Sequence, residues 1–319
     1  MVSSSIPTVD LSPFFNEGGD EHGRKEAIET ITKACLEHGF FQIVNHGIPT
    51  DLMNKALQHS KTFFQYPPEE KLKSSPRPGE GACQLPIGYN IQPDHSVDKN
   101  EYFLVFQPGS SYNVYPENLP ELRSVMEDLY PRFVGIGSLM ESIINDCLGL
   151  PPNFLKEYND ERSWDFMAAF HYFPATESEN NGITEHEDGN CITFVFQDEV
   201  GGLEVRKDGE WIPVVPEEGS IVVNVADFIQ VMSNKKFNSA THRVVRSEGK
   251  SRYSYGFFYN LNWDKWVEPL PQFTTEIGEP PKYKRFQVRE YQMMRMKNKQ
   301  HPPARPEDEI GITYYAIDT

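Results

Sequence analysis

The sequence predicts a mainly β protein with flanking helices, whose central strands form an antiparallel sandwich or jelly roll. The first observation is a series of short β-type runs between residues 164 and 262, among them MAAFHYF, CITFVFQD and YSYGFFYN. The second is that turn signals such as Asp208-Gly209 separate these runs, a spacing typical of sandwiches and jelly rolls. The third is that apolar residues recur every three or four positions on both sides of this stretch, which predicts helices.

Short elements are predicted near the N-terminus. Residues 6–14 predict a strand that enters the fold, and residues 22–38 predict a helix whose apolar stripe stops at Gly39. The β-rich run at 40–44 ends in an Asn-His-Gly turn signal.

Longer helices are predicted before and after the β-rich stretch. A second helix begins near Pro49, and a long helical pattern covers residues 119–149, where Pro131 should interrupt or kink it. A further helix is expected near residues 286–299. Residues 74–98 are rich in Pro, Gly and Ser and predict a surface loop.

Length and charge narrow the classes of function. The chain has 319 residues, enough to bury a sizeable core without disulfides or a structural metal. Its formal net charge of −17 disfavours nucleic acid and anionic membrane surfaces as partners. No basic segment precedes an apolar leader, and no apolar run approaches 18 residues, so neither a secretory signal nor a transmembrane helix is predicted. We expect a cytoplasmic protein with no obligate protein partner.

The cysteines point to the same compartment. Cys35, Cys83, Cys147 and Cys191 are widely spaced and form no C-x-x-C pair, which argues against a zinc ribbon and a disulfide framework. Cys35 and Cys147 fall on apolar stripes, so buried free thiols in a reducing environment are predicted.

A candidate metal site comes from two β-type runs. In the segment Thr184 to Gly189, His186 and Asp188 project to the same face of an extended chain. A second run, about 56 residues later, supplies His242. Two imidazoles and one carboxylate on neighbouring strands form the facial triad of non-haem Fe(II) oxygenases, which leaves open positions on the metal.

A candidate carboxylate clamp follows ten residues after His242. Arg252 and Ser254 face the same way in a strand, and a guanidinium can bind a carboxylate through two hydrogen bonds while a hydroxyl adds a third. Taken alone, Arg252 fits a surface ion pair better. Because Arg252 follows the triad in sequence, it is instead suited to bind the far carboxylate of a dicarboxylate whose other end chelates the metal.

These motifs make the chain similar to a known family. It resembles the plant-type 2-oxoglutarate and Fe(II)-dependent dioxygenases, and the resemblance covers nearly the whole chain. The matching segments are IPTVDLS (6–12), ACLEHGFFQIVNHGIP (34–49), GY (88–89), DKNEYF (98–103), NVYPENLPELR (113–123), HED (186–188), ITFVFQDEVGGLEV (192–205), WIPVVPEEGSIVVNVADFIQVMSN (211–234), SATHRVV (239–245) and RYS (252–254).

The resemblance implies a double-stranded β-helix, or jelly roll, as one catalytic unit. Its parts would be an α-rich N-terminal region (1–160), the catalytic core (161–265) and a C-terminal helical cap (266–319). His186, Asp188 and His242 would bind Fe(II). Arg252 and Ser254 would bind the cosubstrate 2-oxoglutarate, with O2 as the oxidant and ascorbate as a stimulant.

The chain departs from the family pattern near the clamp. Relatives often carry Asn-Tyr-Tyr-Pro where this chain has His171-Tyr172-Phe173-Pro174, and their last Tyr helps to hold 2-oxoglutarate. Phe173 lacks the hydroxyl for that contact. His171 lies where the Asn would be and is a candidate to bind the cosubstrate, with a structural histidine as the alternative. Glu187 replaces a common Thr and should point away from the metal.

The resemblance also predicts oxidation, by hydroxylation in the simplest case, of a small ring-containing plant metabolite. Two alternatives remain open, an ascorbate-using oxidase like 1-aminocyclopropane-1-carboxylate oxidase and a non-catalytic jelly-roll binding protein. The residues expected to line an apolar substrate cavity are Phe258, Phe103, Phe106, Phe170, Tyr89 and Met294.

Overall fold

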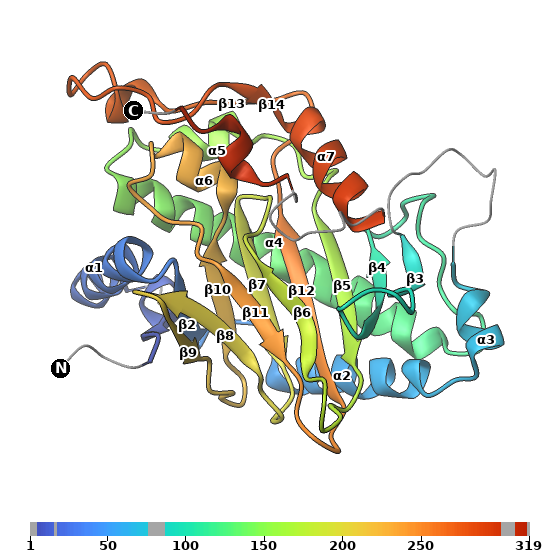
Figure 1. The fold of residues 1–319 in the computed structure, drawn as a ribbon. Coiled ribbons are helices and arrows are strands. Elements are labelled where there is room, and N and C mark those ends of the chain that lie inside the picture. The colour runs from blue at the N-terminus through green and yellow to red at the C-terminus, as the bar shows by residue number, and fades with distance from the viewer. Residues whose placement is uncertain (1–4, 16–17, 76–86, 301–309, 318–319) are drawn as a thin grey trace.

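The computed structural model describes residues 5–15, 18–75, 87–300 and 310–317, and most of its strands belong to two sheets (Figure 1). The large sheet contains β1 (Thr8–Asp10), β2 (Phe40–Val44), β3 (Gly88–Ile91), β4 (Asn100–Val105), β5 (Phe166–Tyr172), β7 (Ile192–Gln197), β10 (Ile221–Val225) and β12 (Arg252–Tyr259). The small sheet contains β6 (Asn181–His186), β8 (Leu203–Lys207), β9 (Glu210–Pro213) and β11 (His242–Val245). A short ribbon pairs β13 (Trp266–Val267) with β14 (Phe286–Gln287).

The strand order shows how distant segments meet. In the large sheet the order is β1-β2-β10-β7-β12-β5-β4-β3, and in the small sheet it is β6-β11-β8-β9. The described pairings are antiparallel except for β1 with β2. Since β6 and β7 are consecutive but lie in different sheets, the connection between them crosses from one sheet to the other. This architecture confirms the predicted mainly β fold with flanking helices.

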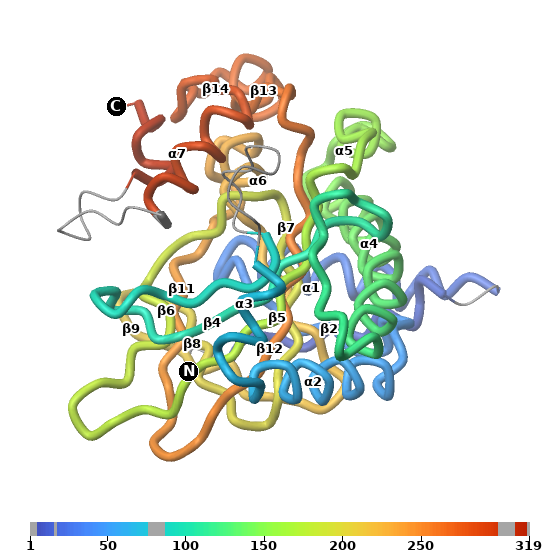
Figure 2. The backbone as a smooth tube through the Cα atoms, turned by 90° about the vertical axis from the view of Figure 1, so that its right-hand side faces the viewer, coloured from blue at the N-terminus to red at the C-terminus, as the bar shows by residue number. Residues whose placement is uncertain are grey.

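The helices are α1 (Glu21–Glu37), α2 (Thr50–Phe64), α3 (Pro68–Leu72), α4 (Pro120–Leu148), α5 (Phe154–Tyr158), α6 (Asp227–Met232) and α7 (Val288–Gln300). Helices α1, α2 and α4 cover the face of the large sheet that points away from the small one, whereas α7 lies on the other side (Figures 1 and 2). The main apolar core lies between this face and the helices; Phe133 of α4 stacks on Phe196 and Phe257 of the sheet. A second apolar cluster, which includes Phe40, Val205 and Val244, lies between the two sheets.

The boundary between α1 and β2 follows the sequence signal. Gly39 adopts a left-handed backbone conformation, with φ of 68°. A Cβ atom at this position would also lie 2.3 Å from the carbonyl oxygen of Asn238. Glycine is therefore required both by the backbone and by the close approach of the neighbouring chain.

The long helix differs from expectation at Pro131. Of the two alternatives for Pro131, the interruption is wrong, because α4 runs unbroken from Pro120 to Leu148, and the kink stays a prediction. Pro131 is exposed, so water can satisfy the carbonyl that loses its helical partner. The buried stripe of α4, which includes Leu129 and Phe133, supplies packing that maintains the helix across the proline.

The predicted surface loop at 74–98 is also partly wrong. Gly88–Ile91 forms β3, which pairs with β4 so that Tyr89 lies opposite Phe103. Glycine and asparagine have low strand propensity, and here pairing with β4 overrides it. Residues 76–86 of this segment lie outside the described residues.

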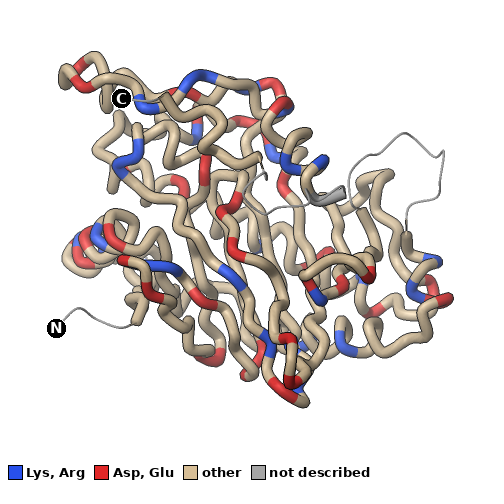
Figure 3. The backbone as a smooth tube through the Cα atoms, viewed as in Figure 1, with Lys and Arg blue, Asp and Glu red and all other residues tan. Residues whose placement is uncertain are grey.

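Charged residues are spread over the fold (Figure 3), and the described cysteine thiols are buried. Figure 3 shows acidic residues on helices, strands and loops alike, with Lys and Arg interspersed. Cys35 and Cys147 are buried free thiols as predicted, and Cys191 is a third; Cys83 lies outside the described residues. Among the helices that the structure describes, none is long and apolar enough to span a membrane.

Candidate active site

The structure brings the three predicted metal ligands together. His186 ends β6, His242 begins β11, and the two residues lie directly opposite each other in the small sheet. Asp188 follows in the connection that crosses to β7. The Nε2 atoms of both histidines lie 3.7 Å from Asp188 Oδ1, and the three ligand atoms lie within 4.8 Å of one another. This arrangement fits an Fe(II) ion held on one face.

Backbone contacts orient both imidazoles toward the centre. Nδ1 of His186 lies 2.8 Å from the carbonyl oxygen of Thr184, and Nδ1 of His242 lies 3.1 Å from that of Ala240. Since a carbonyl can only accept, each Nδ1 carries the proton and each Nε2 presents a lone pair. Burial and the neighbouring His242 lower the pKa of His186 to about 3, so this imidazole is neutral and ready to bind metal at neutral pH.

Two further residues hold the Asp188 carboxylate. Its Oδ2 atom accepts hydrogen bonds from Thr193 Oγ1 (2.7 Å) and Asn224 Nδ2 (3.0 Å), which leaves Oδ1 facing the histidines. Burial raises the pKa of Asp188, but the two histidines and these hydrogen bonds outweigh it and bring the pKa to about 2. Neither donor was predicted from the sequence. Asn224 was detectable as a lone amide within the apolar strand IVVNV.

These donors give a test of the metal centre. Thr193→Val and Asn224→Leu are each expected to raise the dissociation constant for Fe(II) about 10- to 100-fold, since outer partners of a metal ligand typically contribute that much. The measurement is an anaerobic Fe(II) titration. Thr32→Val is the matched control, because the Thr32 hydroxyl donates to the carbonyl oxygen of Ile28 in its own helix and contacts no residue of the triad. Equal affinities in all three variants and the parent would contradict this assignment.

The predicted clamp residues lie together on β12. Arg252 and Ser254 are buried, and Arg252 Nη1 donates to Ser254 Oγ at 3.1 Å. Arg252 Nη2 donates to Gln197 Oε1 on β7 at 2.8 Å, and the guanidinium lies 4.6 Å from the ring centre of Tyr172 on β5. Arg252 Nε and Gln197 Nε2 are buried without a hydrogen-bond partner among the described residues. Such unused donors fit a carboxylate.

The clamp includes Tyr172 in place of His171. The register pairs Arg252 with Tyr172, and His171 points to the opposite face of the sheet because side chains alternate. There it contacts Glu101 at 2.8 Å and stacks on Tyr253, with ring centres 4.7 Å apart. The expectation that His171 binds the cosubstrate is therefore corrected in favour of the structural alternative. Phe173 lacks a hydroxyl, but Tyr172 carries one beside Arg252 and Ser254, and burial raises the pKa of Tyr172, so it stays protonated.

His171 belongs to a buried polar cluster around Glu101. The Glu101 carboxylate is fully buried and accepts from Lys71 Nζ at 2.6 Å and from Tyr89 OH at 2.5 Å. Burial raises the pKa of Glu101, but its hydrogen bonds with His171, Lys71 and Tyr89 and the Lys71 charge lower it overall. The cluster joins α3, β3, β4 and β5 on the face away from the metal.

Lys71→Met should destabilise the fold by leaving this carboxylate unpaired. We expect the free energy of unfolding to fall by about 3–5 kcal/mol at neutral pH, the usual cost of breaking a buried ion pair. Since Glu101 has a lowered pKa in the folded parent, its stabilising effect is present above the ordinary pKa of about 4.3 and is lost as the pH falls. The deficit of the variant, measured by urea unfolding, should therefore shrink on acidification. A deficit independent of pH would contradict this account.

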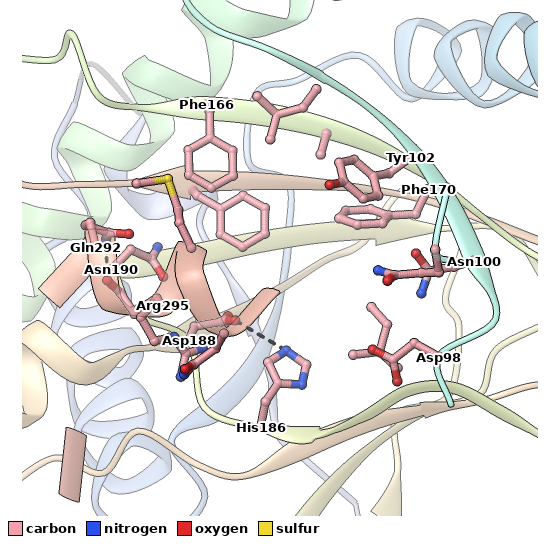
Figure 4. Close-up of a pocket in the computed structure, with 18 of the residues that line it drawn as sticks. Asp98, Asn100, Tyr102, Phe166, Phe170, His186, Asp188, Asn190, Gln292 and Arg295 are labelled. Carbon is pink, nitrogen blue, oxygen red and sulfur yellow. Dashed lines mark hydrogen bonds and ion pairs between the residues drawn. The ribbon is translucent and has the colours of Figure 1, made fainter. Parts of the chain in front are cut away.

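A cavity of about 580 Å³ adjoins the metal site (Figure 4). Of the predicted lining residues, Phe106, Phe170 and Phe258 line it. Further aromatic residues, which were not predicted from the sequence, also line it, and they include Tyr102, Phe166, Trp164 and Trp263. Phe166 stacks on Phe258, with ring centres 4.4 Å apart.

Three predicted lining residues lie elsewhere. Tyr89 and Phe103 face the main core, where their ring centres lie 5.8 and 5.2 Å from that of Phe63. Met294 packs against the same core, and Met296 lines the cavity in its place. The face that an aromatic residue takes depends on strand register, which these sequences do not reveal, because both faces of β4 and β5 are apolar.

Glu187 is held away from the cavity. Its Oε1 atom accepts a hydrogen bond from Thr241 Oγ1 at 2.6 Å, and it is not among the cavity-lining residues. This placement agrees with the expectation from strand alternation.

Comparisons with known proteins agree with this geometry. One family model, described as the 2OG-Fe(II) oxygenase superfamily, matches residues 163–261, and another, the non-haem dioxygenase in morphine synthesis N-terminal domain, matches residues 6–117. The Arabidopsis thaliana protein 1-aminocyclopropane-1-carboxylate oxidase 5 is 33% identical over 90% of this chain and 92% of its own. The chain belongs to the 2OG-Fe(II) oxygenase superfamily. This oxygenase is also 33% identical to flavonol synthase/flavanone 3-hydroxylase of Matthiola incana, over 90% of this chain and 96% of the relative.

Solved structures confirm the jelly-roll fold class. The crystal structure of JOX2 in complex with 2OG, Fe and JA has a TM-score of 0.79 and 27% identity, and the match covers 91% of this oxygenase and 84% of that chain. The crystal structure of a full-length Neurospora crassa protein in complex with alpha-KG and 5-formyluracil has a TM-score of 0.80 and 25% identity, with 93% and 97% covered. The protein is therefore an enzyme of the 2OG-Fe(II) oxygenase superfamily, in which oxygen is a cosubstrate, and its His-Asp-His site fits Fe(II).

Proposed function

We propose that this oxygenase oxidises a small, ring-containing metabolite, in the simplest case by hydroxylation. One C–H bond of the substrate becomes C–OH, while 2-oxoglutarate and O2 are converted to succinate and CO2. The observation that carries this proposal is the aromatic wall beside the triad, where Phe166 stacks on Phe258 and Trp164 stacks on Trp263 with ring centres 3.8 Å apart. A cavity of about 580 Å³ lies within the usual range for small ligands.

The protein's part in this reaction is to bind and orient. His186, Asp188 and His242 would hold the iron, which when bound supplies the redox chemistry of oxygen activation. Arg252, Ser254 and Tyr172 would bind the far carboxylate of 2-oxoglutarate through charge-assisted hydrogen bonds. Phe258 and Phe170 would position the ring near the metal, and the aromatic wall would exclude water from it.

Coupled succinate release tests the proposal. The purified oxygenase, with Fe(II) and 2-oxoglutarate, is incubated with a panel of ring-containing plant metabolites, and succinate is measured. We expect at least one metabolite to raise succinate above the substrate-free rate, with one oxidised product formed per succinate. A chelator should abolish both products. If acyclic compounds alone stimulated turnover, the proposed substrate class would be wrong.

The second candidate is an ascorbate-using oxidase, favoured by the match to 1-aminocyclopropane-1-carboxylate oxidase 5 over 92% of that relative. The Arg252 and Ser254 pair does not separate the two candidates, because it fits any carboxylate. Product formation with ascorbate in the absence of 2-oxoglutarate, and no succinate in its presence, would favour the second candidate.

A further inference from the structure

Helix α7 is bonded to the loop that carries the carboxylate ligand. Arg295 Nη2 donates to the carbonyl oxygen of Glu187 at 2.5 Å, and Gln292 Nε2 donates to that of Gly189 at 2.6 Å. These carbonyls belong to the residues immediately before and after Asp188. Both side chains therefore reach the metal-binding loop from the same face of one helix, three residues apart, as neighbours on a helix surface do.

The carbonyl of Asp188, which lies between those of Glu187 and Gly189, is linked to α7 through Asp227. The backbone N–H of Asp227 donates to the carbonyl oxygen of Asp188 at 3.0 Å. Asp227 is fully buried, and its Oδ2 atom accepts from the hydroxyl of Tyr291, also fully buried, at 2.5 Å. Three consecutive carbonyls of the loop are thus bonded either to α7 or to a residue that α7 contacts.

Helix and loop pack closely at Gly189. A Cβ atom at this position would lie 3.2 Å from Tyr291 Cε1 and 3.4 Å from Arg295 Nε. A side chain at residue 189 would therefore require the helix or the loop to shift by a few tenths of an ångström. From the other side, Thr193 and Asn224 bond the Asp188 carboxylate itself. The ligand is consequently fixed at its backbone and at its side chain by different parts of the fold.

We propose that Gln292 and Arg295 are positioning residues for the iron ligand Asp188, fixing the loop backbone on either side of it. Neither would touch the metal. Both also line the cavity (Figure 4). Met296 and Asn298 of the same helix line it as well. A substrate that contacts α7 would therefore touch the same helix that positions the Asp188 carboxylate. The inference rests on the metal site of the proposed function.

Metal affinity in the absence of substrate tests this role. Arg295→Met and Gln292→Met are each expected to raise the dissociation constant for Mn(II) about 10-fold in the full chain, measured from the free Mn(II) signal in electron paramagnetic resonance. Arg295→Lys keeps one donor and should recover part of the affinity. Gly189→Ala, which inserts a methyl group between loop and helix, should weaken binding without removing a donor.

The matched control is Arg289→Met on the same helix. The Arg289 guanidinium pairs with the exposed Asp264, so its loss should leave Mn(II) affinity unchanged. The melting temperature of each metal-free variant is recorded alongside. Lower melting temperatures with Mn(II) affinity within twofold of the parent would overturn the positioning role. Failure of the parent to bind Mn(II) would overturn the metal site and this inference together.

Discussion

Replacing Asp188 with alanine is expected to abolish succinate formation and to raise the dissociation constant for Fe(II) by more than about 100-fold, the upper end of what outer partners contribute. The change removes the anionic ligand of the site. It also leaves the Thr193 hydroxyl and the Asn224 amide without their acceptor. Anaerobic Fe(II) titration and succinate assay measure the two effects separately.

An exposed carboxylate provides the control for Asp188. Asp264 is largely exposed and pairs with Arg289 at the surface, so Asp264→Ala should retain parental affinity and turnover. If Asp188→Ala bound Fe(II) with an affinity within tenfold of that of the parent and still released succinate, Asp188 would not be a ligand of the metal.

Replacing Arg252 with methionine is expected to act on the cosubstrate rather than on the metal. Loss of charge-assisted hydrogen bonds to a carboxylate costs about 1.5–3 kcal/mol, which corresponds to a roughly 10- to 150-fold rise in KM for 2-oxoglutarate. Fe(II) affinity should stay near that of the parent, because the guanidinium bonds Ser254 and Gln197 and not the triad. Steady-state kinetics at varied 2-oxoglutarate, with an Fe(II) titration alongside, separates these effects.

Two further variants provide an intermediate case and a control for Arg252→Met. Arg252→Lys keeps the charge but loses the planar two-point geometry, so its KM should lie between those of the parent and Arg252→Met. Arg243→Met removes a partly exposed arginine that pairs with Glu204, and it should leave KM unchanged. If KM for 2-oxoglutarate is unaffected in Arg252→Met, the cosubstrate is bound elsewhere.

The chemistry-bearing residues were predictable because strand geometry fixes them locally. In a strand, residues two apart share a face, which pairs Arg252 with Ser254 within β12. The same reasoning predicted His186 with Asp188, although Asp188 lies just beyond the end of β6. His242 required only that its strand lie next to β6, and the register places it directly opposite His186. The domain limits at 160 and 265 stay a prediction.

Other parts of the site depend on which strands and helices pack together, and the local sequence does not determine this. His171 and Tyr172 are adjacent in sequence, and only the pairing of β5 with β12 shows which of them faces Arg252. Gln292 and Arg295 lie about 100 residues after the loop they bond, in a segment whose apolar spacing says nothing about where it docks.

Part of the cavity wall comes from a segment that carries no metal ligand, which partly separates substrate choice from the reaction itself. Residues 92–106 contribute to the wall but not to the triad, so exchanging this segment for that of a relative should alter substrate range while iron binding persists. Helix α7 belongs to both, since it lines the cavity and bonds the loop around Asp188. A chimera that exchanges α7 should therefore change selectivity and metal retention together.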